Sequence, residues 1–225
     1  MRQVWHDLLF AHWPVDAALL RPHIPAGLEI DTFDGTAWIA VVPFRMSGIR
    51  PPGVPALPWI SAFAELNVRA YVKRDGRPGV WFFSLDAANP LAVAVARAWF
   101  KLPYYRAAMR CEPEGEAIRY QSRRTHSGAA PAELTGAYRP EGSVFEAQPG
   151  TLPYFLTARY CLYTASEAGA VYRGEIDHDP WPLQNASAEF ARNTMTAGLG
   201  IALAGPPLLH FSRRIDVRVW GLRRL

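Results

Sequence analysis

The chain has 225 residues, half of them hydrophobic, and its 24 basic and 20 acidic side chains give a net charge of +4. This composition excludes a disordered chain, and the length suffices for a substantial core, so we expect one domain over residues 1–225. The 20 prolines and 17 glycines are spread along the chain, which is typical of many short strands joined by turns.

The first part of the chain is predicted to be mostly strand. The expected elements are strands over residues 4–13, 28–33 and 37–46 and a short helix near residues 16–20. The dipeptide Asp34-Gly35 favours a hairpin between the second and third of these strands. The proline-rich segment 48–58 predicts an irregular loop and a candidate lid over a site.

The next strand, residues 63–72, alternates between two kinds of side chain. One face carries Ala64, Leu66, Val68, Ala70 and Val72, and the other carries Phe63, Glu65, Asn67, Arg69 and Tyr71. Because the first face is apolar and suits the core, we expect the second to point to water or into a polar cavity.

A helix is predicted between Asn89 and Pro103. Asn89 is a favourable N-cap, the following proline suits a first helical turn, and Pro103 ends the helix. The apolar residues at helical spacing predict a face that packs on a sheet; they are Leu91, Val95, Ala98 and Leu102. Arg97 and Lys101 share another face.

The rest of the chain is predicted to contain short elements. They are a strand over residues 80–85, a hairpin over 107–124, a strand over 133–138, a helical turn over 151–157, strands over 160–164 and 171–177, a helix from 185 or 187 to 197, and a strand from about 208. About ten strands with two to four short helices indicate an α+β, mostly β protein rather than a doubly wound sheet.

Composition also bears on compartment and partners. Cys111 and Cys161 have no metal-ligand spacing, and each lies in a strand-like run, so we expect two reduced, buried thiols rather than a disulfide. A signal peptide and a long apolar run are both missing, which predicts a cytoplasmic protein with no membrane partner. The C-terminal arginines alternate with apolar residues, which favours a half-buried strand with a solvated face over a nucleic-acid patch.

A family resemblance is carried by eight blocks that span almost the whole chain. They are HWPV (12–15), LRPHIPAGLEID (20–31), FAELNVRAYV (63–72), GVWFFSLDA (79–87), ARAWFKLPYY (96–105), FLTARYCLY (155–163), HDPWPLQ (178–184) and LLHFSRR (208–214). In these blocks the chain resembles the YqjF-like family of uncharacterised bacterial proteins, within the acetoacetate decarboxylase-like superfamily. The resemblance implies a β cone or barrel with a few short flanking helices around a small pocket.

The resemblance also identifies a missing group. Acetoacetate decarboxylase forms a Schiff base between a substrate ketone and a lysine that a cationic neighbour activates. In the superfamily these two residues follow a proline at the end of the helix, and here those positions hold Tyr104 and Tyr105. Since a phenol cannot form an imine, we expect no Schiff-base decarboxylase. Lys101 is interpreted as a solvated side chain near the helix C-terminus rather than a relocated nucleophile.

Glu65 is the acidic position that the resemblance preserves. In a mostly apolar cavity its pKa would rise, and it could serve as a general acid or base. The alternative is a structural ion pair with Arg69 on the same strand face. Asn67 and Arg69 are predicted to orient an anionic or carbonyl ligand.

Aromatic and histidine side chains complete the candidate site. Tyr104 is predicted to donate a catalytic hydrogen bond, and Tyr105 is a ligand-binding candidate with simple packing as its alternative. His178 is a candidate for proton transfer, with Trp181 as a pocket wall; the alternative is an ordinary loop histidine. Motifs for metal, phosphate or dinucleotide binding are missing, so no metal and no cofactor is expected.

These observations predict a small-molecule-binding protein or an enzyme whose ligand is a small carbonyl or carboxylate compound. A catalytic version would use acid–base chemistry, such as enolisation, hydration or dehydration, of the lyase or isomerase type. The alternative is a non-catalytic ligand sensor or binding module. Nucleic-acid binding ranks last, and assembly into a homo-oligomer stays open.

Overall fold

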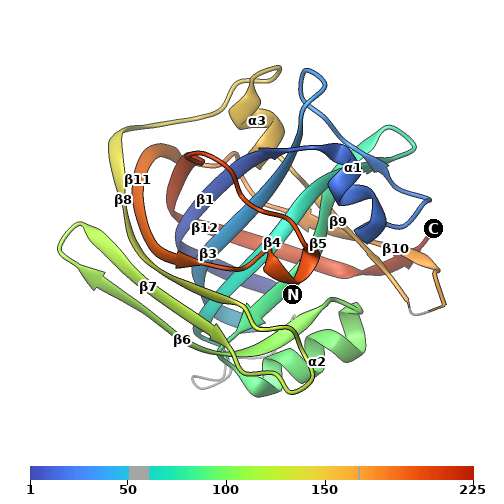
Figure 1. Ribbon diagram of the computed structural model, residues 1–225, viewed down its shortest axis with the longest axis horizontal. Helices are drawn as coiled ribbons and strands as arrows, with labels where there is room; N and C mark the ends of the chain where they lie inside the picture. Colours follow the sequence, from blue (N-terminus) through green and yellow to red (C-terminus); the bar gives the residue numbers. More distant parts are fainter. Residues whose placement is uncertain (51–60, 167) are drawn as a thin grey trace.

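The computed structural model describes residues 1–50, 61–166 and 168–225, and Figure 1 shows a strongly curved sheet with short helices at its edges. The described strands are β1 (Arg2–Val15), β2 (Glu29–Ile30), β3 (Ala37–Arg50), β4 (Phe63–Arg74), β5 (Arg77–Ala87), β6 (Tyr104–Glu114), β7 (Ala117–Arg124), β8 (Glu133–Phe145), β9 (Cys161–Ala165), β10 (Val171–Asp177), β11 (Leu183–Asn193) and β12 (Leu208–Arg224). The helices are α1 (Ala17–Leu20), α2 (Pro90–Phe100) and α3 (Leu152–Thr157), with 3-10 turns at Arg21–His23 and Ala197–Leu199. The prediction of a mostly β, α+β protein is confirmed.

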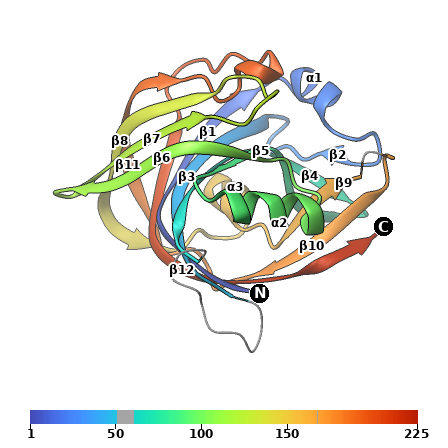
Figure 2. The same cartoon turned by 90° about the horizontal axis from the view of Figure 1, so that it is seen from below.

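The strand pairings close part of the sheet into a ring. The described strands follow the order β10-β9-β5-β6-β7-β8-β11-β12-β1-β3-β4-β2, and two further pairings join β10 to β12 and β4 to β5. These pairings connect β1, β3, β4, β5, β9, β10 and β12 into a closed circuit, which Figure 2 shows end on. A closed circuit removes exposed strand edges and encloses an interior.

Four of the remaining described strands form a wing that leaves the ring at β5 and returns at β12, and the short strand β2 pairs only with β4. The wing is β6-β7-β8-β11, and its side chains pack with the outward face of β4 in the largest apolar core. Leu66 and Val68 from β4 and Tyr120 and Leu134 from the wing are all buried there. The apolar face predicted for β4 therefore lies in the core between ring and wing, and the opposite face of β4 lines the ring interior.

Helix α2 crosses one end of the ring, and α3 lies at the other end (Figures 1 and 2). The side chain of Asn89 accepts hydrogen bonds from the backbone N–H groups of Leu91 and Ala92 at 3.0 and 3.1 Å, which caps α2 as predicted. The predicted packing face was wrong. Leu91 is 53% exposed and Val95 is 40% exposed, because α2 spans an opening instead of lying flat on a sheet.

The helix predicted over residues 185–197 is also wrong, because this segment forms strand β11 and then the 3-10 turn Ala197–Leu199. Ala186, Ala188 and Phe190 pack against the main core at a spacing of two, which is the period of a strand. Antiparallel pairing with β8 on one side and β12 on the other overrides the local helix preference of alanine and glutamate.

The predicted hairpin at Asp34-Gly35 is reduced to a single bridge between Phe33 and Thr36. The short strand β2 pairs with β4 instead of β3. Asp34 and Gly35 form the turn between the two bridged residues, but the preceding segment runs beside β4 and therefore cannot pair with β3. The predicted lid falls largely on residues 51–60, which lie outside the described residues, and Gly48–Arg50 belong to β3.

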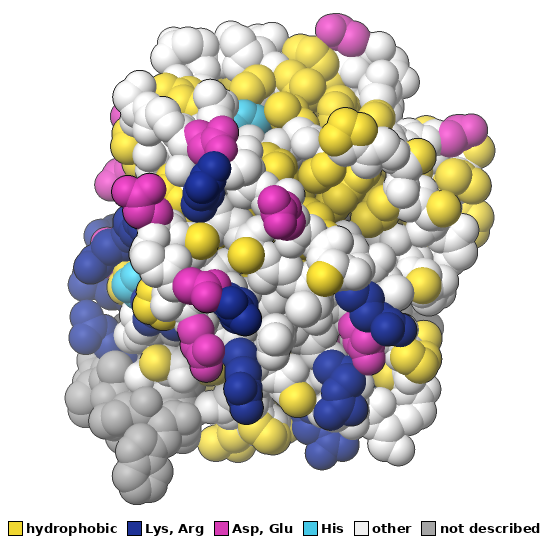
Figure 3. Space-filling model, turned by 60° about the vertical axis from the view of Figure 1, so that its left-hand side comes forward, with side chains coloured by type: hydrophobic (Ala, Val, Ile, Leu, Met, Phe, Trp, Pro, Cys, Tyr) yellow, Lys and Arg dark blue, Asp and Glu magenta, His cyan; other side chains and the backbone are white. Residues whose placement is uncertain are grey.

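The C-terminal strand β12 alternates as predicted. Ile215, Val217 and Val219 are buried, while Asp216 and Arg218 are exposed. On the face shown in Figure 3, basic and acidic side chains are interspersed rather than gathered by sign. Cys111 and Cys161 are free thiols, as predicted, but only Cys161 is buried, whereas Cys111 is half-buried.

Candidate functional site

The interior of the ring holds a cavity of about 370 Å³. Its walls come from the ring strands, and α2 covers one end. Most of the lining is apolar, including Val42, Phe44, Met46, Phe82, Leu162 and Val219. The polar residues of the described lining are Gln3, Glu65, Asn67, Arg69, Tyr104, Thr157, Arg159 and His178. An apolar cavity with a few convergent polar groups is the usual form of a small-molecule site.

Glu65 lies in this cavity and is only 3% exposed. The Tyr104 hydroxyl donates a hydrogen bond to Glu65 Oε2 at 2.8 Å. Burial raises the pKa of Glu65 to about 8, the Tyr104 hydrogen bond lowers it in part, and nearby Asp86 raises it. Burial also raises the pKa of Tyr104 well above its ordinary value, and the adjacent Glu65 adds to the rise. At neutral pH the pair is therefore a carboxylic acid next to a phenol.

The alternative of a Glu65–Arg69 ion pair is not found among the described residues. Arg69 is 8% exposed; its Nη2 donates a long hydrogen bond, 3.4 Å, to the carbonyl of Leu156 in α3, and its guanidinium also interacts with Tyr71, 5.7 Å from the centre of that ring. Its Nε has no described partner, and its guanidinium lies 5.2 Å from the ring centre of Phe10. Asn67 Oδ1 is likewise buried without a described partner. A buried cation and a buried acceptor therefore face the cavity with unused hydrogen-bonding capacity.

His178 and Trp181 form another part of the cavity wall. His178 Nδ1 lies 2.7 Å from the carbonyl oxygen of Asp179, and since a carbonyl only accepts, Nδ1 carries the proton. Burial lowers the pKa of His178, so the ring is neutral at pH 7 with Nε2 unprotonated. Trp181 packs 4.9 Å from the His178 ring, and its indole N–H donates to the carbonyl of Thr157 at 2.9 Å. The tryptophan thus fixes the histidine against α3.

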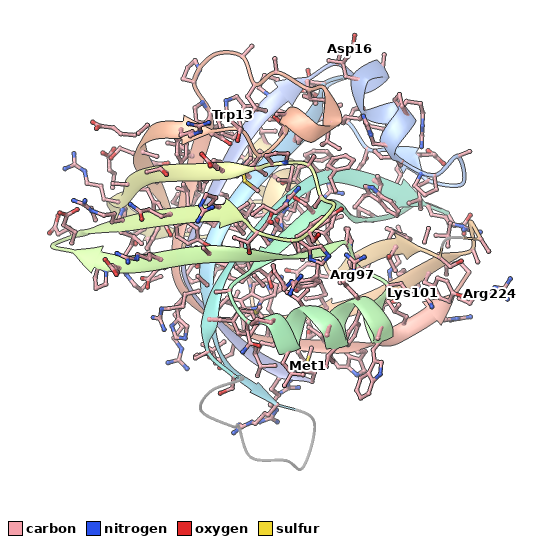
Figure 4. All side chains as sticks on the ribbon, turned by 60° about the horizontal axis from the view of Figure 1, so that its bottom comes forward. Met1, Trp13, Asp16, Arg97, Lys101 and Arg224 are labelled. Carbon is pink, nitrogen blue, oxygen red and sulfur yellow. The ribbon has the colours of Figure 1, made fainter. Side chains whose placement is uncertain are left out.

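Tyr105 and Lys101 do not enter the cavity. Tyr104 and Tyr105 are successive residues of β6, so their side chains point to opposite faces. Tyr105 stacks 4.2 Å from the Arg124 guanidinium on the outer side, which is the packing alternative. Lys101 is an exposed C-cap residue 5.6 Å from the ring of Tyr172. Figure 4 shows Arg97 and Lys101 together at the C-terminal end of α2.

Arg159, which was not among the predicted site residues, is 6% exposed and lines the cavity. Its Nη1 donates to Asp31 Oδ2 at 2.6 Å and its Nε donates to the carbonyl of Phe155 at 2.7 Å. A signal was present, because Arg159 lies in the block FLTARYCLY, where a charged residue interrupts an apolar run. Its charge is already compensated, so Arg69 is the cavity cation left to meet a ligand.

The described residues contain neither a metal-binding cluster nor a membrane-spanning helix. No group of three or more His, Cys, Asp or Glu side chains in that part of the chain could hold a metal ion. Within the same ranges, no helix is long and apolar enough to cross a membrane.

Solved structures share this architecture. The chain superposes on acetoacetate decarboxylase from Legionella pneumophila with a TM-score of 0.65 and 12% identity, covering 100% of this chain and 86% of that one. It matches the enduracididine biosynthesis enzyme MppR in complex with pyruvate with a TM-score of 0.66 and 13% identity, covering 99% and 89%. An acetoacetate decarboxylase-like enzyme from Sphingomonas wittichii gives 0.64 and 14%, covering 100% and 92%. The ring and its cavity therefore define a protein of the acetoacetate decarboxylase-like fold.

Sequence comparison places the chain more closely. Residues 2–216 match the model of the DUF2071 family, described as an uncharacterized conserved protein. The uncharacterized protein YqjF of Bacillus subtilis is 47% identical over 225 residues, which cover 100% of this chain and 92% of YqjF. The chain belongs to the DUF2071 family.

Proposed function

We propose that the cavity binds a small carbonyl or carboxylate compound and that Glu65 exchanges a proton with it. The observation that carries this proposal is the placement of the Glu65–Tyr104 pair in an apolar cavity that also contains Arg69 without a described carboxylate partner. Unpaired buried charge is costly, and a bound anion would compensate it. MppR, which shares the fold, is described in complex with pyruvate, a compound of this class.

The chemistry follows from the protonation states of two side chains. Protonated Glu65 accepts from Tyr104 at Oε2, so its own O–H is available to a ligand carbonyl oxygen. Neutral His178 can accept a proton from the carbon next to that carbonyl. Transfer of one proton to oxygen and removal of one from carbon converts a ketone to its enol. Return of both protons restores the side chains, so enolisation needs no further reactant.

The proposal excludes imine chemistry at the helix end. By the family resemblance, Tyr104 stands where the decarboxylases have an amine, and Lys101, the nearest amine along the chain, is exposed outside the cavity lining. Treating the protein with acetoacetate or pyruvate and then borohydride should leave its mass unchanged. A stable adduct on Lys101 would contradict this assignment, and Lys101→Ala provides the control for nonspecific modification.

The direct test is deuterium exchange into pyruvate and acetoacetate in D₂O, followed by NMR. The wild-type protein should accelerate exchange at the carbon next to the ketone, and Glu65→Gln should reduce the rate by roughly 10²-fold or more with binding within a few-fold of wild type. Exchange at the wild-type rate in Glu65→Gln would contradict the catalytic role. Binding of the compounds without any exchange would assign the cavity to a sensor or binding module instead.

A further inference from the structure

The cavity is larger than a ketoacid of a few carbon atoms requires. Its volume of about 370 Å³ falls within the range of roughly 300–1,000 Å³ that holds drug-sized ligands. A ligand the size of pyruvate would leave most of this space empty or filled with water against apolar walls. Such a ligand would bury little apolar surface against the lining and so would gain little hydrophobic binding free energy.

The polar groups of β4 are arranged along the axis of the ring. Glu65 lies beside Tyr104, next to the end of α2, whereas Arg69 contacts the backbone of α3 at the other end of the ring. At about 3.3 Å per strand residue, their Cα atoms are separated by roughly 13 Å. An anionic group held by Arg69 would therefore sit near the α3 end, and the rest of the ligand would extend toward α2.

The α2 end of the cavity is apolar and reaches solvent. Leu91 and Val95 both line the cavity and are 53% and 40% exposed, so they form part of its rim. Ala92, Ala96 and Phe100 of the same helix also face the interior. None of these side chains can hydrogen-bond a ligand, so the α2 end of the cavity suits an apolar group such as a hydrocarbon chain.

We infer that the ligand is an amphipathic monocarboxylate, with its carboxylate at Arg69 and an apolar chain of several carbons running past Glu65 to the underside of α2. This inference rests on the proposed function, because it assumes that the cavity binds a carboxylate. It adds the ligand class: a medium-chain acyl compound instead of a short ketoacid.

The test is a chain-length series measured by isothermal titration calorimetry at pH 7, from butanoate through hexanoate and octanoate to decanoate. Burial of one methylene contributes about 0.8 kcal/mol, which corresponds to a gain in affinity of about fourfold per methylene. We expect the dissociation constant to fall with each added methylene until the chain reaches the rim.

A matched pair of substitutions on α2 locates the chain. Ala96 lines the cavity, whereas Ala98 is exposed and lies outside the lining. Ala96→Phe should weaken decanoate binding by roughly tenfold or more, the equivalent of losing about two buried methylenes, and should leave butanoate within about twofold. Ala98→Phe carries the same change in helix propensity and should leave both ligands unaffected.

The outcomes separate this inference from the proposed function. Affinity that does not change with chain length, with Arg69→Met weakening every ligand, would overturn the medium-chain assignment and leave the carboxylate site standing. Equal effects of Ala96→Phe on butanoate and decanoate would overturn it as well. Failure of every alkanoate to bind the wild-type protein while pyruvate still binds would overturn the medium-chain assignment alone, and failure of pyruvate and acetoacetate as well would overturn both.

Discussion

Two buried carboxyl groups on neighbouring strands, Glu65 of β4 and Asp86 of β5, differ in the partners that surround them. Asp86 is 0% exposed on the wing side, and Arg124 of β7 binds it with two hydrogen bonds of 2.7 Å. Glu65 is 3% exposed on the cavity side and receives only the Tyr104 hydroxyl. Burial raises the pKa of both groups, but only Asp86 has a guanidinium that opposes the rise.

The same contrast holds for the buried arginines. Arg124 is paired with Asp86 and Arg159 with Asp31, at 2.7 and 2.6 Å, while Arg69 has no carboxylate partner in the described ranges. Ordinary structural stabilisation pairs each buried charge with its opposite. In the cavity, by contrast, Glu65 and Arg69 lie on the same face of β4 and form no ion pair with each other among the described residues. This difference supports the proposal that the cavity side binds a ligand, whereas the paired charges on the wing side stabilise the fold.

The largest expected effect comes from breaking the structural pair. Arg124→Ala leaves Asp86 buried without its cation and should reduce the free energy of unfolding by about 3–5 kcal/mol, measured by urea denaturation. Arg119→Ala removes an exposed pair with Glu114 and should leave the urea midpoint unchanged. A loss as small for Arg124→Ala as for this control would contradict the structural role of the pair.

Glu65→Gln should change how stability depends on pH. Because the pKa of Glu65 in the folded protein is about 8, above the ordinary 4.5, the folded state keeps a proton that the unfolded state releases between these values. Wild-type stability relative to Glu65→Gln should therefore fall as pH rises through this window, by on the order of 1.4 kcal/mol per pH unit, and level off above pH 8.

Urea denaturation of both proteins at a series of pH values measures this difference, and subtraction cancels the contributions of the buried histidines. If the difference in unfolding free energy between the two proteins stays constant between pH 4.5 and 8, Glu65 ionises at its ordinary pKa. That result would contradict the claim that burial in the cavity raises the pKa of Glu65.

Tyr104→Phe should have a smaller effect. It removes the hydrogen bond that lowers the pKa of Glu65, so this pKa should rise further, and the lost bond should cost about 1 kcal/mol of stability. The infrared carbonyl stretch of the protonated carboxyl should then persist to higher pH. Tyr105→Phe is the matched control, since its ring lies outside the cavity, and a similar shift in that variant would argue against the assignment.

The smallest effect on stability is expected for Arg69→Met. Removal of a buried cation that has no carboxylate partner relieves its desolvation cost, and methionine can fill the space, so stability should change by less than about 1 kcal/mol. Binding of butanoate should nevertheless be lost. Arg159→Met, which leaves Asp31 without its partner, should be clearly more destabilising, and the reverse order of the two variants would contradict the contrast between paired and unpaired arginines.

Much of the cavity face could be predicted from local sequence. The alternation of Glu65, Asn67 and Arg69 with apolar residues is a strand signal that needs no tertiary information. The same period assigns Tyr104 and Tyr105 to opposite faces once their strand is recognised. From the sequence, Tyr104 and Tyr105 were expected just after the helix that ends at Pro103, and no strand was predicted to begin there, so their alternation was not used.

Other features depend on contacts between distant segments. Closure of the ring requires β10 to pair with β12 and β4 to pair with β5, and no local pattern specifies the first pairing. The apolar residues of α2 predict a face that packs on a sheet. In the structure this face is exposed because the helix spans the opening of the ring, which the sequence does not indicate. Residues 185–197 contain good helix formers, and only pairing with both β8 and β12 makes their first part a strand.

The most direct test of the central claim is a ¹³C NMR titration of the glutamate side-chain carboxyls, with Glu65→Gln used to assign the Glu65 signal. The structure predicts a Glu65 resonance that titrates near pH 8, so that the carboxyl is protonated at neutral pH. A Glu65 resonance that titrates near 4.5, the ordinary value, would contradict the claim that the cavity holds a neutral acid.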